Sequence, residues 1–189
     1  MMILNIVDET SPLESLIVGI ADSSGGTPEL EDVYDPKSRE HILSGTYPLE
    51  SDMISELDCF VSKLINYGIK VFRPDLITNY NQIYSRDIGF VIEDIFFKSN
   101  ILPKRSREIE ALKIILNTLN PDSIINFPED AHIEGGDVVL HKNKIYVGAY
   151  IKSDYPNYIT ARTNLRGLRV LQNYFPNKEV VLLELNKSN

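Results

Sequence analysis

Residues 132–140 read HIEGGDVVL, and this stretch decides the fold: two acids enclose a pair of glycines directly before an apolar run. Glycine lets the backbone turn tightly and lets another group approach closely. The carboxylates of Glu134 and Asp137 are then available to a cationic group, while the apolar residues behind them predict a strand. We therefore expect the stretch to combine a binding site with the start of a sheet.

The apolar run is the first half of a predicted hairpin, which is followed by a helix and one more strand. Lys142, Asn143 and Lys144 are expected to make the turn, and Asn164 is a good N-cap for the helix. The predicted elements are strands at residues 137–140 and 145–148, a helix at 164–175 and a strand at 179–185. Their order is strand, strand, helix, strand (ββαβ).

The same order occurs twice more toward the N-terminus, with one strand missing or hidden in the first copy. The second copy has predicted strands at 88–92 and 94–97, a helix at 105–119 and a strand at 123–127. The first has a strand at 16–21, a long polar loop to about residue 46, a helix at 48–67 and a strand at 69–72. Recurrence at roughly 50 to 60 residues predicts a modular α/β ring or array. A doubly wound parallel sheet is the main alternative, but the strand pairs have no helix between them.

The composition is that of an ordinary globular protein, and its charge limits the partners. The net charge of -8 argues against a nucleic-acid surface and suits cationic small ligands. No apolar run is long enough to span a membrane, and the first residues lack the basic segment of a signal peptide. Cys59, the single cysteine, is expected to pack at or near the core rather than act as a nucleophile. We expect a cytoplasmic protein.

Acids stand at equivalent places in two of the repeats. Asp87 precedes the second strand pair as Glu134 and Asp137 precede the third. In a ring of modules such positions converge on the axis, so these acids would form one anionic site. A guanidinium, with five donors around a planar rim, suits several carboxylates. A metal site with His132, a glycosidase acid pair and ordinary turn acids are the alternatives.

Arginines stand at the starts of the two later helices. Arg105 and Arg107 open the helix at 105–119, and Arg162 directly precedes the helix at 164–175. Cations are unfavourable at a helix start, so their presence indicates an anionic partner such as a carboxylate. Together with the acids, they predict a zwitterionic ligand with a guanidinium at one end and a carboxylate at the other.

The motifs, taken together and in order, resemble the guanidino-group-modifying (pentein) superfamily, which includes amidinotransferases, arginine deiminases and dimethylarginine dimethylaminohydrolases. The residues that carry this resemblance are SRD at 85–87, FVI at 90–92, KRSRE at 104–108, EGGDV at 134–138, VG at 147–148, RTN at 162–164 and Gly167. The segments DPKS at 35–38 and GTYPLE at 45–50 look most like the amidinotransferase branch.

The resemblance implies a pentein-like α/β propeller of five ββαβ modules around the active site. About three modules are present, so residues 1–189 would be a single domain with an incomplete ring, the N-terminal part of a longer catalytic domain. It also implies that Asp87, Glu134 and Asp137 line the guanidinium site. Arg162 and one of Arg105 and Arg107, of which Arg105 is preferred, would hold the substrate carboxylate. No cofactor or metal is implied.

The family's catalytic histidine lies in a His-x-Asp motif beyond the third module, and its nucleophilic cysteine lies near the C-terminus. Neither His132 nor Cys59 matches these positions, so we expect no catalytic residue in this chain. The expected function is the N-terminal portion of an amidinotransferase-like enzyme that acts on arginine, or a related compound, through a thiolate intermediate. The chain alone would be inactive. The alternatives are a deiminase-type hydrolase and a non-catalytic binding or assembly module. A missing C-terminal segment or a second copy would cover the open module edge.

Overall fold

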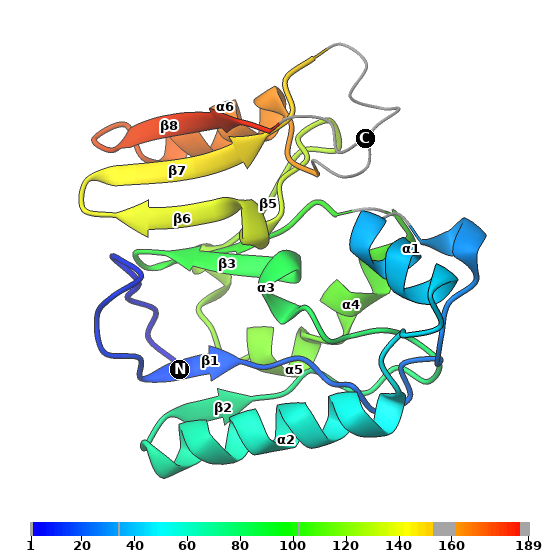
Figure 1. The fold of residues 1–189 in the computed structure, drawn as a ribbon. Helices are drawn as coiled ribbons and strands as arrows, with labels where there is room; N and C mark the ends of the chain where they lie inside the picture. Colours follow the sequence, from blue (N-terminus) through cyan, green and yellow to red (C-terminus); the bar gives the residue numbers. More distant parts are fainter. Residues whose placement is uncertain (1, 34, 102, 153–161, 186–189) are drawn as a thin grey trace. The chain divides into compact units, whose positions relative to one another are not determined.

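The computed structural model describes residues 2–33, 35–101, 103–152 and 162–185. The chain forms two compact units: residues up to 12 and from 86 onward make the first, and residues 13–85 make the second. The strands in the described part of the chain form three separate sheets (Figure 1). The mixed α/β class is confirmed, and the alternative of one doubly wound sheet is wrong. No helix among the described residues is both long and apolar enough to cross a membrane.

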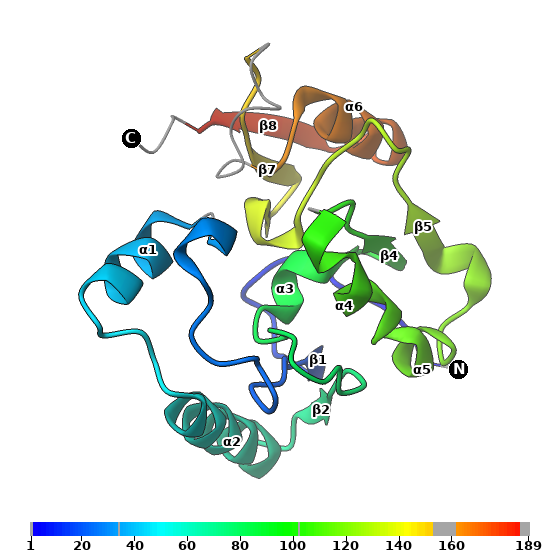
Figure 2. The same cartoon turned by 90° about the vertical axis from the view of Figure 1, so that its right-hand side faces the viewer.

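The first unit contains the predicted hairpin, helix and final strand. Strand β6 (Val138–His141) pairs antiparallel with β7 (Lys144–Ala149), and β7 pairs parallel with β8 (Glu179–Glu184). Helix α6 (Leu165–Tyr174) packs along one face of this sheet (Figure 2). It begins where predicted, because the Asn164 side chain accepts a hydrogen bond from the amide of Gly167.

A second sheet in the same unit repeats this topology. Strand β3 (Gly89–Ile92) pairs antiparallel with β4 (Ile95–Lys98), and β4 pairs parallel with β5 (Ile124–Asn126). The continuous helix predicted at 105–119 is wrong: the chain forms η2 (Pro103–Arg105), α4 (Ser106–Glu110) and α5 (Lys113–Leu116). The amide of Leu112 bonds the carbonyl of Ile109, three residues back, which tightens the backbone between α4 and α5.

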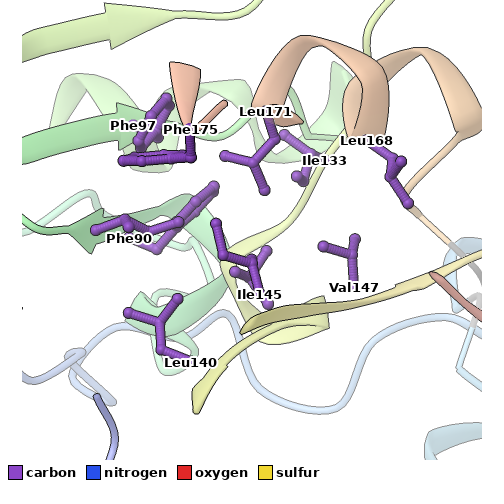
Figure 3. Close-up of a cluster of buried hydrophobic side chains, with 11 residues drawn as sticks. Phe90, Phe97, Ile133, Leu140, Ile145, Val147, Leu168, Leu171 and Phe175 are labelled. Atoms are coloured by element: carbon purple, nitrogen blue, oxygen red, sulfur yellow. The ribbon is translucent and has the colours of Figure 1, made fainter. Parts of the chain in front are cut away.

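One apolar core joins both sheets of this unit to helix α6 (Figure 3). The Phe90 and Phe97 rings stack with their centroids 5.2 Å apart, and Phe175 from the end of α6 lies 5.9 Å from Phe97. Ile133, inside the opening stretch, is fully buried in this core. The polar residues on either side of Ile133 are therefore held on a rigid support.

The second unit is a parallel strand pair with helices. Strand β1 (Ser15–Ile17) pairs with β2 (Lys70–Phe72), and helix α2 (Glu50–Asn66) runs beside β2 (Figure 1). The region predicted as a polar loop contains η1 (Leu30–Asp32) and helix α1 (Pro36–Leu43). The cap at Asp35, whose carboxylate accepts from the amide of Ser38 at 2.7 Å, accounts for the helix that the prediction missed.

The placement predicted for Cys59 is wrong, because this residue is exposed. The half-buried stripe of α2 runs through Leu57, Val61 and Leu64, at the spacing of one helix face. Cys59 follows Leu57 by two residues, which turns its side chain to the other side of the helix.

Candidate functional site

The first unit brings the predicted acids and arginines together. Asp87 lies on the one-turn helix α3 (Ser85–Ile88), and Glu134 directly precedes η4 (Gly135–Asp137). Six charged side chains form what we call the ionic cluster: Asp87, Arg105, Glu108, Glu134, Asp137 and Arg162. Its six members come from four segments that are far apart in the sequence, so only the tertiary fold creates it.

Arg105 is held on two sides by carboxylates. Its Nε and Nη2 atoms donate to the two oxygens of Glu108 at 2.6 and 2.9 Å, and its Nη1 donates to Asp87 Oδ2 at 2.8 Å. The structure therefore places Arg105 among the acids. Glu108 is 2% exposed and was not among the predicted site residues. Its spacing of three from Arg105 at the start of a helix is the sequence signal for this pair.

Glu134 is the most deeply buried acid of the predicted set, at 3% exposure. Its Oε2 lies 3.0 Å from Arg162 Nη1, which is also 3.7 Å from Asp87 Oδ2. Its other oxygen, Oε1, is buried and has no hydrogen-bond partner among the described residues. A buried carboxylate oxygen without a donor is costly, so this atom is a candidate acceptor for a ligand.

Thr163 connects the two acids of the opening stretch. It is fully buried, and its hydroxyl donates to Asp137 Oδ2 at 2.5 Å. The Thr163 hydroxyl oxygen also accepts a hydrogen bond from the amide of Glu134 at 3.2 Å. The next residue continues the contact, because the amide of Asn164 donates to the carbonyl of His132 at 3.0 Å. The RTN and HIEGGD segments are thus fastened together over several residues.

Gly135 and Gly136 allow α3 to lie close to the backbone, and neither glycine has a positive φ. A Cβ on Gly136 would stand 2.6 Å from Asp87 Oδ1, and one on Gly135 would stand 2.2 Å from the carbonyl oxygen of Arg86. Arg86 in turn donates to the carbonyls of Gly135 and Val138 at 2.9 and 2.7 Å. Glycine at 135 is therefore required for α3 to lie against the start of β6, and glycine at 136 leaves room for the Asp87 carboxylate.

Burial changes the acidity of the cluster. Burial raises the pKa of Glu134 to about 7, and the charges of Asp87 and Asp137 act in the same direction against the opposing effect of Arg162. Burial also raises the pKa values of Asp137 and Glu108. For Arg105, burial alone would lower the pKa, but its bonds to Glu108 and Asp87 raise it above the ordinary value. The cluster is therefore rich in acids that favour an added positive charge.

The cluster has the chemistry of a cation-binding site. Its four carboxylates face two guanidiniums, so with every group ionised it carries an excess of two negative charges within the described part of the chain. Across the described ranges, no group of three or more His, Cys, Asp or Glu side chains is arranged to hold a metal ion. Several carboxylate acceptors in one place suit a planar organic cation with several N–H groups.

No family model matches the chain. It is 30% identical over 109 residues, 56% of its length, to the uncharacterized protein YkgA of Bacillus subtilis (strain 168). That match covers 33% of the relative.

Several solved structures have a similar fold. The amidinotransferase SxtG of the saxitoxin biosynthetic pathway from Microseira wollei aligns over 95% of this chain and 62% of its own, with a TM-score of 0.67 and 19% identity. The inosamine-phosphate amidinotransferase StrB1 of Streptomyces griseus aligns over 94% and 62%, with a TM-score of 0.67 and 18% identity. The dimethylarginine dimethylaminohydrolase of Pseudomonas aeruginosa, complexed with citrulline, aligns over 93% and 62%, with a TM-score of 0.66 and 15% identity.

These similarities show the fold of the chain. They confirm, for the fold, the resemblance that the motifs predicted. The chain spans 62% of the length of each of these solved structures and a third of the length of YkgA. Fold alone does not establish function, which depends on the chemistry of the site.

Proposed function

Since the chain has the fold of the guanidino-group-modifying superfamily, we propose that it binds an arginine-like guanidino compound in the ionic cluster. Asp87, Glu134 and Asp137 would accept hydrogen bonds from the guanidinium. The observation that carries this proposal is the buried Glu134 carboxylate, which has one oxygen without a partner among the described residues and a raised pKa in an acid-rich site. A guanidinium supplies both the missing donor and the missing charge.

Arg162 is proposed to hold the ligand's carboxylate. It is 29% exposed, and its link to Glu134 is a single ion pair at 3.0 Å, so an incoming guanidinium would compete with it for Glu134. We also propose that Arg105 contributes to binding the ligand's carboxylate. The Arg105 guanidinium already forms ion pairs with Glu108 and Asp87, so binding a ligand carboxylate would break those bonds.

For the chemistry, we propose an amidinotransferase-type enzyme, with a guanidino hydrolase as the alternative. The solved structures of similar fold include enzymes of both names. A thiolate would add to the guanidinium carbon, which the carboxylates hold and polarise. The bond from that carbon to the ligand's side-chain nitrogen would then break, the amine would leave with a proton from an imidazole, and an amidino group would remain on sulfur. We propose that neither the thiolate nor the imidazole comes from residues 1–189, because neither Cys59, which is exposed on α2, nor His132 stands in the family's catalytic motifs.

We further propose that the chain is one domain of ββαβ modules in an incomplete ring. The repeated topology of the β3–β4–β5 and β6–β7–β8 sheets supports this arrangement. Among the described residues, the outer strands of each sheet pair with a neighbouring strand on one side only. Further chain or a second copy would cover such an edge. Light scattering at increasing concentration tests the second copy, and a strict monomer would exclude it.

Calorimetric titration of the chain with L-arginine tests the binding proposal. We expect arginine to bind and its neutral analogue citrulline to bind at least about tenfold more weakly, because citrulline leaves the acids without a cation. The substitutions Asp87→Asn and Asp137→Asn should each weaken arginine binding by a similar factor. Asp130→Asn is the matched control, since Asp130 is an exposed acid of the same unit, paired with Arg166.

The absence of both binding heat and thermal stabilisation at millimolar arginine would refute the proposal. Equal loss of affinity in the Asp130 variant would show that only general surface charge is involved. A separate assay for ornithine or citrulline release from arginine, with hydroxylamine as acceptor, tests turnover. We expect no release from residues 1–189 alone, and steady release would overturn the proposed location of the catalytic groups.

A further inference from the structure

Glu108 is a buried acid that the proposed guanidinium contacts do not use. Its side chain is 2% exposed, and both of its oxygens accept hydrogen bonds from Arg105. Burial raises its pKa, so the fold holds a charge here that is expensive to bury. Such a residue can be retained for the geometry that it imposes on its neighbours.

The link from Glu108 to the site runs through one rigid group. The Arg105 guanidinium is planar, so fixing its Nε and Nη2 atoms on Glu108 also fixes the direction of Nη1. Nη1 donates to Asp87 Oδ2 at 2.8 Å. The orientation of the Glu108 carboxylate is thereby transmitted to a residue in the proposed binding set.

The other oxygen of Asp87, Oδ1, lies close to Gly136. Oδ1 lies so near the backbone of Gly136 that an added Cβ would stand 2.6 Å away. The carboxylate thus has a charged donor on Oδ2, and its Oδ1 occupies the space that a side chain at position 136 would take. Hydrogen bonds to a planar guanidinium depend on such orientation, because the acceptors must match its rim.

We propose that Glu108 is a positioning residue, which orients Asp87 for the guanidinium by clamping Arg105. This inference rests on the proposed function and adds a determinant of ligand geometry that does not itself contact the ligand. It predicts that Glu108 acts through Asp87 and independently of Glu134.

A double-mutant cycle tests this dependence, with arginine affinity as the readout. Glu108→Gln keeps the shape of the side chain but removes the charge and one acceptor, so we expect about a tenfold loss of arginine affinity. In the Asp87→Asn background the same change should cause no further loss. In the Glu134→Gln background it should again cause about a tenfold loss. Equal losses in all three backgrounds would overturn the inference.

Two further variants keep the test decisive. Glu110→Gln removes the same charge from an exposed position of helix α4, and its arginine affinity should match that of the unmodified chain. Arg105→Lys retains the positive charge but not the planar guanidinium, so it should reproduce the tenfold loss even if the Glu108 variant fails to fold. In the Asp87→Asn background this loss should disappear, which separates the clamp from direct contact between Arg105 and the ligand. Unchanged affinity in Arg105→Lys would contradict the clamp.

A ligand-free measurement separates this inference from the proposed function. In NMR spectra of the unliganded chain, Glu108→Gln should abolish the protected Nε–H signal of Arg105 and move the carboxyl carbon signal of Asp87, whereas Glu110→Gln should do neither. If the unmodified chain does not bind arginine, the proposed function fails, and these two signals still decide the linkage. An unmoved Asp87 signal in the Glu108 variant would refute the linkage itself.

Discussion

Replacement of Glu134 by glutamine should remove a large part of the pH dependence of folding between pH 5 and pH 8. In the folded chain burial raises the pKa of Glu134 to about 7, against 4.5 in the unfolded chain. The folded state therefore binds the proton of the Glu134 carboxyl more tightly than the unfolded state does. This difference stabilises the folded chain fully below pH 4.5, and the stabilisation is lost as the pH rises through 7. The raised pKa corresponds to about 3 kcal/mol in the free energy of unfolding, most of which falls between pH 5 and pH 8.

The measurement is urea unfolding of the unmodified chain and of Glu134→Gln at pH 5, 6, 7 and 8. The difference in unfolding free energy between the two proteins should change by about 2 to 3 kcal/mol across this range, with the unmodified chain losing stability as the pH rises. Glutamine cannot ionise, so the variant lacks this contribution at every pH. Glu108, whose pKa is also raised, acts in the same direction in both proteins and largely cancels in the difference. Asp137, whose pKa is raised as well, is coupled by its charge to Glu134, so that coupling forms part of the measured difference.

Glu110→Gln serves as the control, because it removes an exposed carboxylate from the same unit. Its unfolding free energy should run parallel to that of the unmodified chain at all four pH values. Parallel curves for Glu134→Gln as well would refute the reasoning, since they would mean that Glu134 is ionised in the folded chain at pH 5. A carboxyl-carbon NMR titration that gives Glu134 an ordinary pKa would lead to the same conclusion.

Thr163→Val should lower the free energy of unfolding by about 1 to 3 kcal/mol in urea titrations, because it removes the buried hydroxyl that donates to Asp137. Gly167→Ala should cost about 2 kcal/mol or more by the same measurement, because its Cβ would stand 2.2 Å from the carbonyl oxygen of His132. Cys59, which is exposed, should react with a thiol reagent at the same rate in the native chain as in urea.

Each of these predictions has its own control. Thr163→Ser keeps the hydroxyl and should recover most of the stability, so an equal loss in both variants would point to packing instead. Arg169→Ala places alanine at an exposed position of helix α6 and should change stability little, and the same loss at Gly167 and Arg169 would contradict the clash. A Cys59 thiol that reacts only after urea is added would show that it is protected.

Local sequence patterns were sufficient for most of the first unit. The alternation of β6, the turn at Lys142 and Asn143, and the Asn164 cap depend on residues within a few positions of one another. Local patterns of apolar residues were less reliable where a helix cap or a short-range backbone hydrogen bond changed the local structure. The cap at Asp35 produced a helix in a predicted loop, and three-residue backbone bonds near Leu112 divided a predicted helix.

The sequence by itself determined which residue types stand in the ionic cluster, because the acids and arginines recur at equivalent places in the repeats. Only the tertiary structure decided the pairs between distant segments, in which Arg105 contacts Asp87 and Arg162 contacts Glu134. Burial of Glu134, which raises its pKa and leaves one oxygen without a partner among the described residues, depends on segments distant in the chain. Desolvation is a property of what surrounds an atom in space, and the order of residues does not encode it locally.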